Sequence, residues 1–282
     1  MAKLLEGKPI ADRIKEELKK EIAALENAPV LSSVLVGDNP GAQSYVKSQK
    51  KAAENLGIIY QLHVLPQETG EKALLEFVQE LNRDKSVNGI IIQMPLPEHI
   101  DYKKISQHIN PDKDIEGMNP ANFGKLVFGQ AKILPCTPAA VMELLKESGV
   151  DLYGKETVVV GHSEIVGKPV ALMLLDKFAT VTVCHIGTSK AQKLEEHVRK
   201  AEVLIVAVGR AGLIKGEWVR DGAIVIDVGI NRVGDKISGD VEFEAAEKRA
   251  SFITPVPGGV GPLTVTMLMR NLVAAAALNS RK

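Results

Sequence analysis

The chain has 282 residues, 45% of them hydrophobic, and its 35 Lys and Arg balance 35 Asp and Glu. This length fits one or two domains, since domains commonly hold about 100 to 200 residues. The neutral charge gives no basic patch for nucleic acid or an anionic membrane, no apolar run approaches the roughly 20 residues of a bilayer span, and we expect no signal peptide. The two cysteines show no disulfide or metal-ligand spacing. We therefore expect a small-molecule ligand, no metal and a cytoplasmic location.

The first half of the sequence alternates helical and strand-like segments. Apolar residues recur at steps of three and four over 9–27, which predicts an amphipathic helix covering a sheet. Strands are predicted at 30–36, 58–65 and 88–93, and helices at 42–56 and 71–81. The pattern lapses over 110–138, which is rich in proline, glycine and asparagine. A loop this long in a compact domain is usually functional.

The second half is organised around the sequence TVVVGHSEIVGKPVALML at 157–174. A β-branched strand runs into a glycine turn and then into an apolar helix, so backbone can approach a ligand and the helix start offers unpaired N–H groups. The spacing G-x-S-x-x-x-G-x-P departs from the usual G-x-G-x-x-G, and such a turn is often only a connection. We interpret it as the pyrophosphate cradle of a dinucleotide fold because of the strands that follow.

Further strands are predicted at 180–184, 203–208 and 223–228, each followed by a small residue or a turn. The fold class is α/β, with an N-terminal βαβ domain and a Rossmann-like parallel sheet whose strand ends should surround one crevice. We place a helix at 138–146 and the domain boundary near it, giving 1–138 plus 264–282 and 139–263. The final helix, 264–278, is predicted to pack back on the first domain.

Several polar residues of the first half fall where a site could lie. Tyr45 and Gln49 are four apart and share one helix face, and Gln93 ends a strand. Asp114 and Glu116 lie in the long loop. A core role for Tyr45 and a solvated turn for the two acids are slightly better than even alternatives. The glycine- and proline-rich TPVPGGVGPLT near the end predicts a rigid loop with exposed N–H groups, in preference to a simple connection.

Five motifs in order resemble those of the methylenetetrahydrofolate dehydrogenase/cyclohydrolase family over essentially the whole chain. SYVKSQKKAAENLGI is similar to the family's Y-V-x-x-K helix, and GIIIQMPLP to its Q-L-P-L-P strand end. PDKDIEGMNPANFG resembles its P-x-K-D-V-D-G loop. VVVGHSEIVGKPV and PVPGGVGPLTVTML resemble its cofactor turn and its glycine-proline signature.

The resemblance implies an enzyme that oxidises the methylene bridge of a folate with NAD or NADP and hydrolyses the methenyl product. Tyr45 would border the folate rings, Gln93 would bond near the reacting bridge, and the loop acid Glu116 would bind the pterin. Residues implied to contact the folate also include Met94, Pro95, Pro257 and Gly258. Residues implied to line the dinucleotide are Gly161, His162, Ser163, Ile165, Val166, Gly167, His185, Ile186, Gly209 and Ile230.

One departure from the family concerns its lysine four residues after the tyrosine, where this chain has Gln49. Lys47 and Lys50 lie on other faces of the same helix. An amide cannot take up a proton near neutral pH, whereas hydrolysis needs general acid-base catalysis. Hydride transfer chiefly needs alignment of the two reactants. We therefore predict that Tyr45, Gln49, Gln93 and Glu116 support dehydrogenation, with cyclohydrolase activity lost or weak.

The sequence is also compatible with three further functions. They are a fully bifunctional enzyme, a catalytically silent folate or dinucleotide binder, and a two-domain dehydrogenase of another substrate. Glu116 stands where the family has aspartate, which lengthens the carboxylate's reach. The choice between NAD and NADP is open with a slight lean to NAD, since His162 and Ile186 occupy the places near the adenosine ribose. Apolar strand edges make a homodimer the expected assembly.

Overall fold

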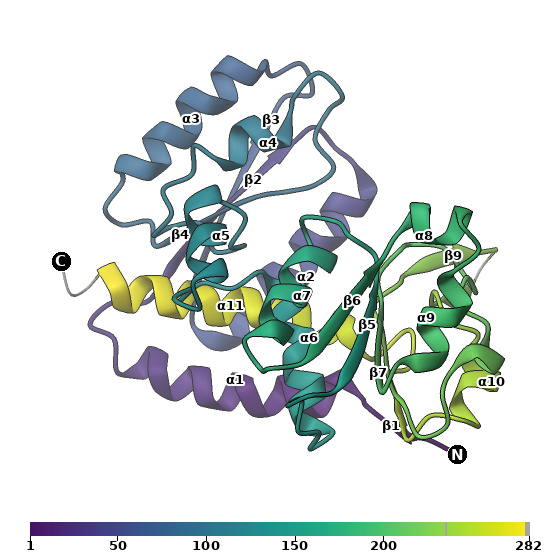
Figure 1. The fold of residues 1–282 in the computed structure, drawn as a ribbon. Helices are drawn as coiled ribbons and strands as arrows, with labels where there is room; N and C mark the ends of the chain where they lie inside the picture. The colour runs from purple at the N-terminus through teal and green to yellow at the C-terminus, as the bar shows by residue number, and fades with distance from the viewer. Residues whose placement is uncertain (235, 280–282) are drawn as a thin grey trace. The chain divides into compact units, whose positions relative to one another are not determined.

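The computed structural model describes residues 1–234 and 236–279, and the chain forms two compact units. The first, called the six-stranded unit, comprises Met1–Asp12 and Thr137–Thr264. The second, called the three-stranded unit, comprises Arg13–Cys136 and Val265–Lys282. Helices α1 (Gly7–Ala23) and α11 (Val260–Asn279) each begin in the first unit and continue in the second (Figure 1).

The six-stranded unit contains a wholly parallel sheet in the order β1-β11-β8-β7-β5-β6. Its strands are β1 (Lys3–Leu4), β5 (Glu156–Val160), β6 (Thr180–Cys184), β7 (Val203–Val206), β8 (Ile224–Asp227) and β11 (Phe252–Ile253). The central strands are almost continuous Val and Ile and are buried, as expected of a parallel sheet covered on both faces. From β5 the chain continues to β6 on one side, and from β6 it crosses to β7 on the other side of β5. The strand order therefore reverses at the carboxyl end of β5, which makes it a topological switch point.

The helices and the small hairpin of this unit complete its layers. They are α6 (Cys136–Glu147), α7 (Gly167–Leu175), α8 (Ile186–Lys190), α9 (Leu194–Lys200), the 3-10 turn η1 (Gly216–Trp218), α10 (Phe243–Glu247) and the antiparallel pair β9 (Asn231–Val233) and β10 (Lys236–Ser238). Val158, Leu204 and Val225 pack with α9 and α10 residues in one buried cluster. The hydrophobic burial that drives this packing contributes about 25 cal/mol per Å² of apolar surface.

The first twelve residues lie in the six-stranded unit, whereas the sequence prediction grouped them with the first domain. Lys3 and Leu4 pair in parallel with Phe252 and Ile253 of β11, and Leu5 N donates to Ile253 O at 2.9 Å. These bonds make β1 the sixth strand of the sheet. The amino terminus therefore belongs to that unit.

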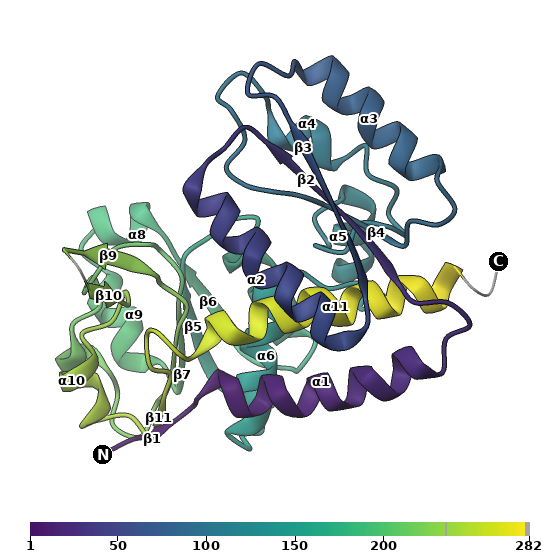
Figure 2. The ribbon, with the colours of Figure 1, turned by 180° about the vertical axis from the view of Figure 1, so that it is seen from behind.

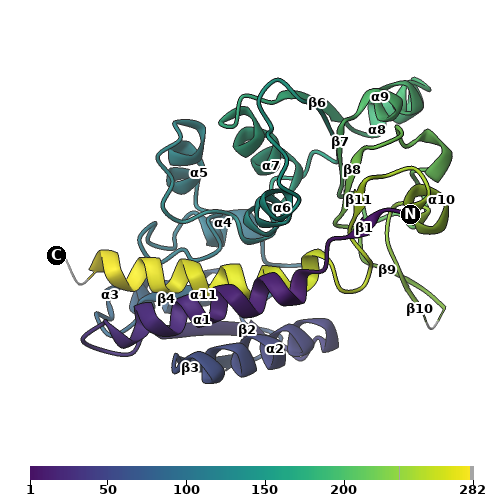
Figure 3. The same cartoon turned by 90° about the horizontal axis from the view of Figure 1, so that it is seen from below.

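The three-stranded unit is built on the parallel order β3-β2-β4. Its strands are β2 (Val30–Val36), β3 (Ile59–Leu65) and β4 (Gly89–Ile92), and its helices are α2 (Pro40–Leu56), α3 (Glu71–Arg83), α4 (Tyr102–Ser106) and α5 (Pro120–Val127), together with the later parts of α1 and α11. Those parts of α1 and α11 run side by side, seen from behind in Figure 2 and from below in Figure 3. Residues of β2, α3 and β4 share one buried apolar cluster.

Two sequence predictions about this unit were incomplete. The long segment 110–138 contains helix α5, which begins where the Asn119 side chain accepts from Ala121 N at 2.8 Å and Pro120 takes the first helical position. Helix α11 starts at Val260, four residues before the predicted start, because Pro262 is tolerated in a first turn.

Helix α11 also corrects the expectation that no apolar run approaches a membrane-spanning length. By length and composition alone, Val260–Leu278 is long and apolar enough to cross a bilayer. However, 61% of that window is buried within the protein. Leu263, Met267, Met269 and Leu272 are fully inaccessible, which is typical of a core helix.

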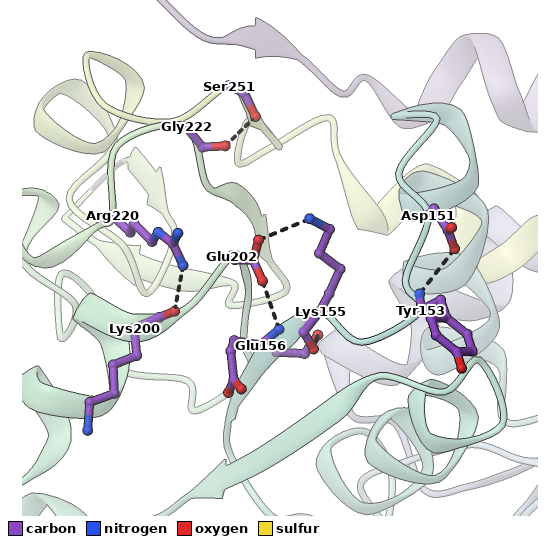
Figure 4. Close-up of polar contacts among 10 residues, drawn as sticks. Asp151, Tyr153, Lys155, Glu156, Lys200, Glu202, Arg220, Gly222 and Ser251 are labelled. Carbon is purple, nitrogen blue, oxygen red and sulfur yellow. Dashed lines mark hydrogen bonds and ion pairs between the residues drawn. The ribbon is translucent and has the colours of Figure 1, made fainter.

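The amino ends of the strands in the six-stranded unit carry a polar cavity of about 210 Å³. Figure 4 shows its main contacts: the Glu202 carboxylate accepts from Lys155 Nζ at 3.0 Å and from Glu156 N at 3.1 Å. Ser251 Oγ donates to Gly222 O at 2.8 Å. Because ligands of such sheets bind beyond the carboxyl ends of the strands, these contacts are structural and lie away from the expected site.

Candidate functional site

Two close contacts between backbone atoms require glycine in the turn after β5. Gly161 has φ +128°, and a Cβ there would lie 2.3 Å from Ala207 O at the end of β7. A Cβ on Gly167, the first residue of α7, would lie 2.1 Å from Gly161 O. The chain thus folds back on itself between strand and helix, and only glycine fits either position.

The turn presents the amino end of α7 without a side-chain cap. Ser163 O accepts from Lys168 N at 3.0 Å and Ser163 Oγ accepts from Val166 N at 3.2 Å, while no side chain caps the helix at its N-cap residue Val166. The first N–H groups of a helix lack intrahelical partners, and the helix dipole favours negative charge there. This end of α7 is therefore suited to an anion.

A cavity of about 310 Å³ lies at the carboxyl ends of β5, β6 and β7. The rings of His162 and His185, both in its wall, are in direct contact, with centroids 5.1 Å apart and planes tilted by 39°. His185 begins α8, where its Nδ1 accepts from Gly187 N at 3.0 Å. The lining residues are Val160, Gly161, His162, Ser163, His185, Ile186, Ser189, Leu194, Ala207, Val208, Arg210 and Leu213.

The cavity brings together half of the residues predicted to line the dinucleotide. Gly161, His162, Ser163, His185 and Ile186 lie in its wall. The others lie outside that wall: Ile165, Val166 and Gly167 form the turn and start of α7, Gly209 follows Val208, and Ile230 is exposed after β8. Sequence reasoning missed Ser189 and Arg210. Their signal was weak, since each is a single polar residue in a connection with no motif around it.

The glycine-proline segment lies in the same unit. Val256–Pro257 is a cis peptide, and Gly258 has φ +115°. Gly258 O accepts from Gly7 N at 2.9 Å, which ties the segment to the first turn of α1. The predicted contact of Pro257 and Gly258 with a folate remains a prediction.

In the three-stranded unit, Gln49 and Gln93 form a buried amide pair. Helix α2 is fixed at its start by the Asn39 side chain, which accepts from Gly41 N and Ala42 N, and ends at Gly57 with φ +75°. Gln49 is 5% exposed on the inner face of this helix, and Gln93, 3% exposed, follows β4. Gln93 Nε2 donates to Gln49 Oε1 at 2.6 Å. Both residues were predicted from the sequence to lie where a site could form, and their roles in a site remain predictions.

Tyr60 and Ser33 hydrogen-bond to the amide pair, and neither was predicted from the sequence. Tyr60 OH donates to Gln49 Oε1 at 3.1 Å, and Gln93 Nε2 donates to Ser33 Oγ at 2.9 Å. Burial raises the pKa of Tyr60 above its ordinary value, so its hydroxyl stays protonated at neutral pH. Neither amides nor this phenol can accept a proton from water near pH 7.

Tyr45, Lys47 and Lys50, which lie near Gln49 on α2, are exposed. Tyr45, one turn earlier, is 54% exposed and available to a ligand. Lys47 is exposed, and Lys50 Nζ lies 3.9 Å from Glu54 on the solvent side. Neither lysine takes the place of a titratable group at position 49. Beyond Gln93, Met94 is 43% exposed and joins Pro95 through a cis peptide.

Asp114 and Lys113 organise the loop between α4 and α5. Asp114 is buried, and its Oδ2 accepts from Asn119 N at 2.7 Å and Asn122 Nδ2 at 3.0 Å. Lys113 Nζ donates to three backbone carbonyls at the end of α3, at 2.6 to 3.0 Å. The solvated-turn alternative is therefore wrong for Asp114, whose carboxylate is committed to the loop itself.

Glu116 is the loop acid that remains available. It is partly exposed, and its Oε2 accepts from Tyr102 OH at 3.3 Å. Burial, with the nearby charge of Asp114, raises the pKa of Glu116 to about 8. A protonated carboxyl can donate and accept, while the ionised group only accepts. Glu116 is thus a titratable group of the three-stranded unit that changes charge near neutral pH.

We expect Gly167→Ala to destabilise the six-stranded unit by about 2 to 3 kcal/mol, because its methyl would overlap backbone atoms that cannot move aside. Gly70→Ala is the matched control, since a Cβ there meets nothing within 4 Å. Thermal melting monitored by circular dichroism measures the difference. Equal melting temperatures for the two variants would contradict the close approach at Gly161.

Comparison with known proteins matches both units to one family. Residues 5–116 match the description "Tetrahydrofolate dehydrogenase/cyclohydrolase, catalytic domain", and residues 135–280 match "Tetrahydrofolate dehydrogenase/cyclohydrolase, NAD(P)-binding domain". The chain is 50% identical over 284 residues to "Bifunctional protein FolD" of Acetivibrio thermocellus, covering 99% of each.

Solved structures agree with the sequence comparison. The bifunctional FolD methylenetetrahydrofolate dehydrogenase/cyclohydrolase of Campylobacter jejuni is 46% identical with a TM-score of 0.95, covering 99% of each chain. The Trypanosoma brucei dehydrogenase-cyclohydrolase, solved with NADP and an inhibitor, is 40% identical with a TM-score of 0.94, covering 100% of this chain and 99% of that one. These matches confirm the predicted α/β fold class and two-domain architecture. The chain belongs to the tetrahydrofolate dehydrogenase/cyclohydrolase family.

Proposed function

We propose that the chain oxidises 5,10-methylenetetrahydrofolate to 5,10-methenyltetrahydrofolate by hydride transfer to NAD or NADP. The observation that carries the proposal is the cavity at the switch point, which is lined by the glycine turn that leads into an uncapped helix start and by two neighbouring histidines. This set fits a dinucleotide: N–H groups and the helix dipole suit a pyrophosphate, and the apolar walls suit an adenosine. The bound nicotinamide would supply the hydride acceptor.

We propose that residues of the three-stranded unit bind the folate. Tyr45 would border the folate rings with its exposed aromatic face. Gln93 and Gln49 would orient the bridge through their amides, which are held by Ser33 and Tyr60. Glu116 would bind the pterin N–H groups. Hydride transfer demands alignment more than proton exchange, so this set is sufficient for oxidation.

Hydrolysis of the methenyl product is a separate activity from oxidation. The relatives' names, "Bifunctional protein FolD", favour the bifunctional alternative over complete loss of cyclohydrolase activity. Yet the side chains that hydrogen-bond to Gln49 are an amide and a phenol that stays protonated. We propose that the chain hydrolyses methenyltetrahydrofolate slowly, with Gln49 as the residue that limits the rate.

The direct test uses purified protein with methylenetetrahydrofolate and each dinucleotide. Reduced nicotinamide should appear at 340 nm, and the methenyl product should then decay faster than without protein. Absence of reduced nicotinamide from folded protein that still binds tetrahydrofolate would favour a silent binder. Oxidation with no enzymatic decay of the methenyl product would favour a dehydrogenase without cyclohydrolase activity.

Cofactor choice is expected to respond to position 162. We predict that His162→Arg raises the ratio of kcat/KM for NADP to that for NAD at least tenfold, because a guanidinium in the cavity wall pairs with a ribose phosphate in bidentate fashion. His99→Arg, an exposed change in the other unit, is the control. An unchanged ratio in His162→Arg would place the adenosine ribose elsewhere.

The homodimer and the cytoplasmic location stay predictions. Sedimentation equilibrium tests the homodimer.

A further inference from the structure

Asp240 is a fully buried acid that the proposed chemistry does not use. Its Oδ2 accepts from Val208 N at 2.7 Å and Gly209 N at 2.9 Å, and its Oδ1 accepts from Arg210 N at 2.7 Å. Asn231 Nδ2 also donates to Oδ1, at 2.9 Å. An ionised carboxylate offers about four acceptor positions, so these four donors fill it.

The three backbone donors are consecutive and converge on one point. Gly209 has φ +70°, the left-handed conformation that turns successive N–H groups toward one side. Such concavities bind anions and often hold phosphate. In this chain the concavity after β7 is filled by the protein's own carboxylate, 30 to 32 residues further along. Its N–H groups are therefore committed, which leaves the Gly161–Gly167 turn as the anion-binding position at the switch point.

The segment that Asp240 holds is a wall of the dinucleotide cavity. Ala207, Val208 and Arg210 line the cavity, and Ala207 lies directly against the turn at Gly161. Asp240 itself is not among the lining residues, so any influence on a ligand must pass through this segment. Asn231, which it also holds, follows Ile230, a residue predicted to contact the dinucleotide.

Asp240 is in turn held from three sides. Its N donates to Asp227 Oδ1 at 3.0 Å, and Val241 N donates to Asp227 Oδ2 at 2.9 Å. Asp240 O accepts from Ile214 N at 3.0 Å. A buried side chain with its backbone fixed in this way cannot swing aside, so the position of the carboxylate sets the position of the segment 208–210.

We propose that Asp240 is a positioning residue for dinucleotide binding, which it serves by filling the N–H concavity of 208–210 and so fixing the cavity wall. The proposal rests on the proposed dehydrogenase function only for the identity of the ligand. Loss of the carboxylate leaves up to three N–H groups without an acceptor, and the wall then relaxes from its binding position.

Asp240→Asn is the variant that tests the positioning role, because it keeps size and removes half of the acceptor capacity. We expect KM for the dinucleotide to rise at least tenfold. The kcat at saturating dinucleotide and KM for methylenetetrahydrofolate should stay within about threefold. A dinucleotide KM within twofold of the unmodified chain would overturn the proposal.

Glu202→Gln is the matched control for lost stability. It is also an acid-to-amide change in the six-stranded unit, but at the amino ends of the strands, where Figure 4 shows the carboxylate bound to Lys155 and Glu156. We expect it to lower the melting temperature and leave the dinucleotide KM within twofold. An equal rise of KM in both variants would mean that general destabilisation, and not the wall, controls binding.

A measurement on the unmodified protein covers the case in which Asp240→Asn does not fold. Amide hydrogen exchange of Val208, Gly209 and Arg210 should be slow without any ligand, at least 100-fold slower than in an unstructured peptide. Rapid exchange there would overturn the role of Asp240. This readout does not depend on which ligand binds, so its failure is distinct from a failure of the proposed oxidation.

Discussion

Replacing Gln49 with lysine is expected to raise the rate of methenyltetrahydrofolate hydrolysis at least tenfold while the kcat of oxidation stays within about threefold. General acid-base catalysis typically contributes 10²- to 10⁴-fold to a step that needs proton transfer. Hydride transfer gains nothing from it. The two activities should therefore separate at this single position.

The surroundings of Gln49 are suited to an amine. Position 49 is 5% exposed, and desolvation lowers the pKa of a lysine placed there toward neutrality, where it can exchange a proton with water. Gln93 can turn its amide to present Oε1 to the new amine, because Ser33 Oγ can donate as well as accept. Tyr60 OH, which now donates to Gln49 Oε1, can accept from the amine instead. Both groups that contact Gln49 can therefore accept from an amine at this position.

Stopped-flow absorbance of the methenyl compound measures hydrolysis, and formation of reduced nicotinamide measures oxidation in the same preparation. Lys50→Gln is the matched control, since it exchanges the same two residue types one position away on the exposed face of α2. It should change neither activity beyond twofold. If Gln49→Lys oxidised normally yet hydrolysed no faster than the unmodified chain, position 49 would not be the limiting residue.

The strands of both units were predictable because their physical cause is local. Short runs rich in Val, Leu and Thr favour strands, and the predicted bounds of the buried β2 and of the edge strand β6 coincide with the observed ones. The helix of Tyr45 and Gln49 was predictable for the same reason, from its apolar spacing and its glycine end. The secondary structure of these segments is therefore determined by the residues close to them in sequence.

The parts that sequence reasoning missed depend on partners far along the chain. Lys3–Leu4 and Phe252–Ile253 are strands of two residues, too short to show any period. Lys3–Leu4 is a strand only through its pairing with Phe252–Ile253, which itself pairs with β8. Tyr60 lies on a strand whose alternation gives no sign that its hydroxyl reaches position 49. Asp240 bonds a turn some 30 residues earlier. Helix α5 is different, because Asn119 and Pro120 form a recognisable helix start. The proline- and glycine-rich composition around them indicated a loop instead.

Glu116 is expected to make tetrahydrofolate binding tighten as pH rises from 6.5 to 8.5. Its pKa is raised to about 8, chiefly by burial and also by Asp114, so the free protein holds a proton there at neutral pH. Donors of the pterin favour the ionised form. If only that form binds, one proton with this pKa weakens the apparent affinity about 25-fold at pH 6.5 relative to pH 8.5.

The same shift fixes the sign of the stability change. The native state keeps the Glu116 proton up to about pH 8, whereas the unfolded chain loses it near the ordinary glutamate value. Stability contributed by this group is therefore present at low pH and declines as pH rises toward 8, by at most about 1.4 kcal/mol per pH unit. Glu116→Gln cannot ionise, so its melting temperature should fall less than that of the unmodified chain over this range.

Calorimetry in two buffers of different ionisation enthalpy counts the protons released when tetrahydrofolate binds. We expect close to one proton at pH 6.5 and close to none at pH 9.5, and none at either pH for Glu116→Gln. Glu54→Gln, an exposed acid-to-amide change on α2, should release protons like the unmodified chain. If Glu116→Gln kept the full proton release, the carboxyl that the pterin ionises would have to be another one. Asp114 could not take that place easily, because its Oδ2 already accepts from Asn119 and Asn122 and the residue is only 2% exposed.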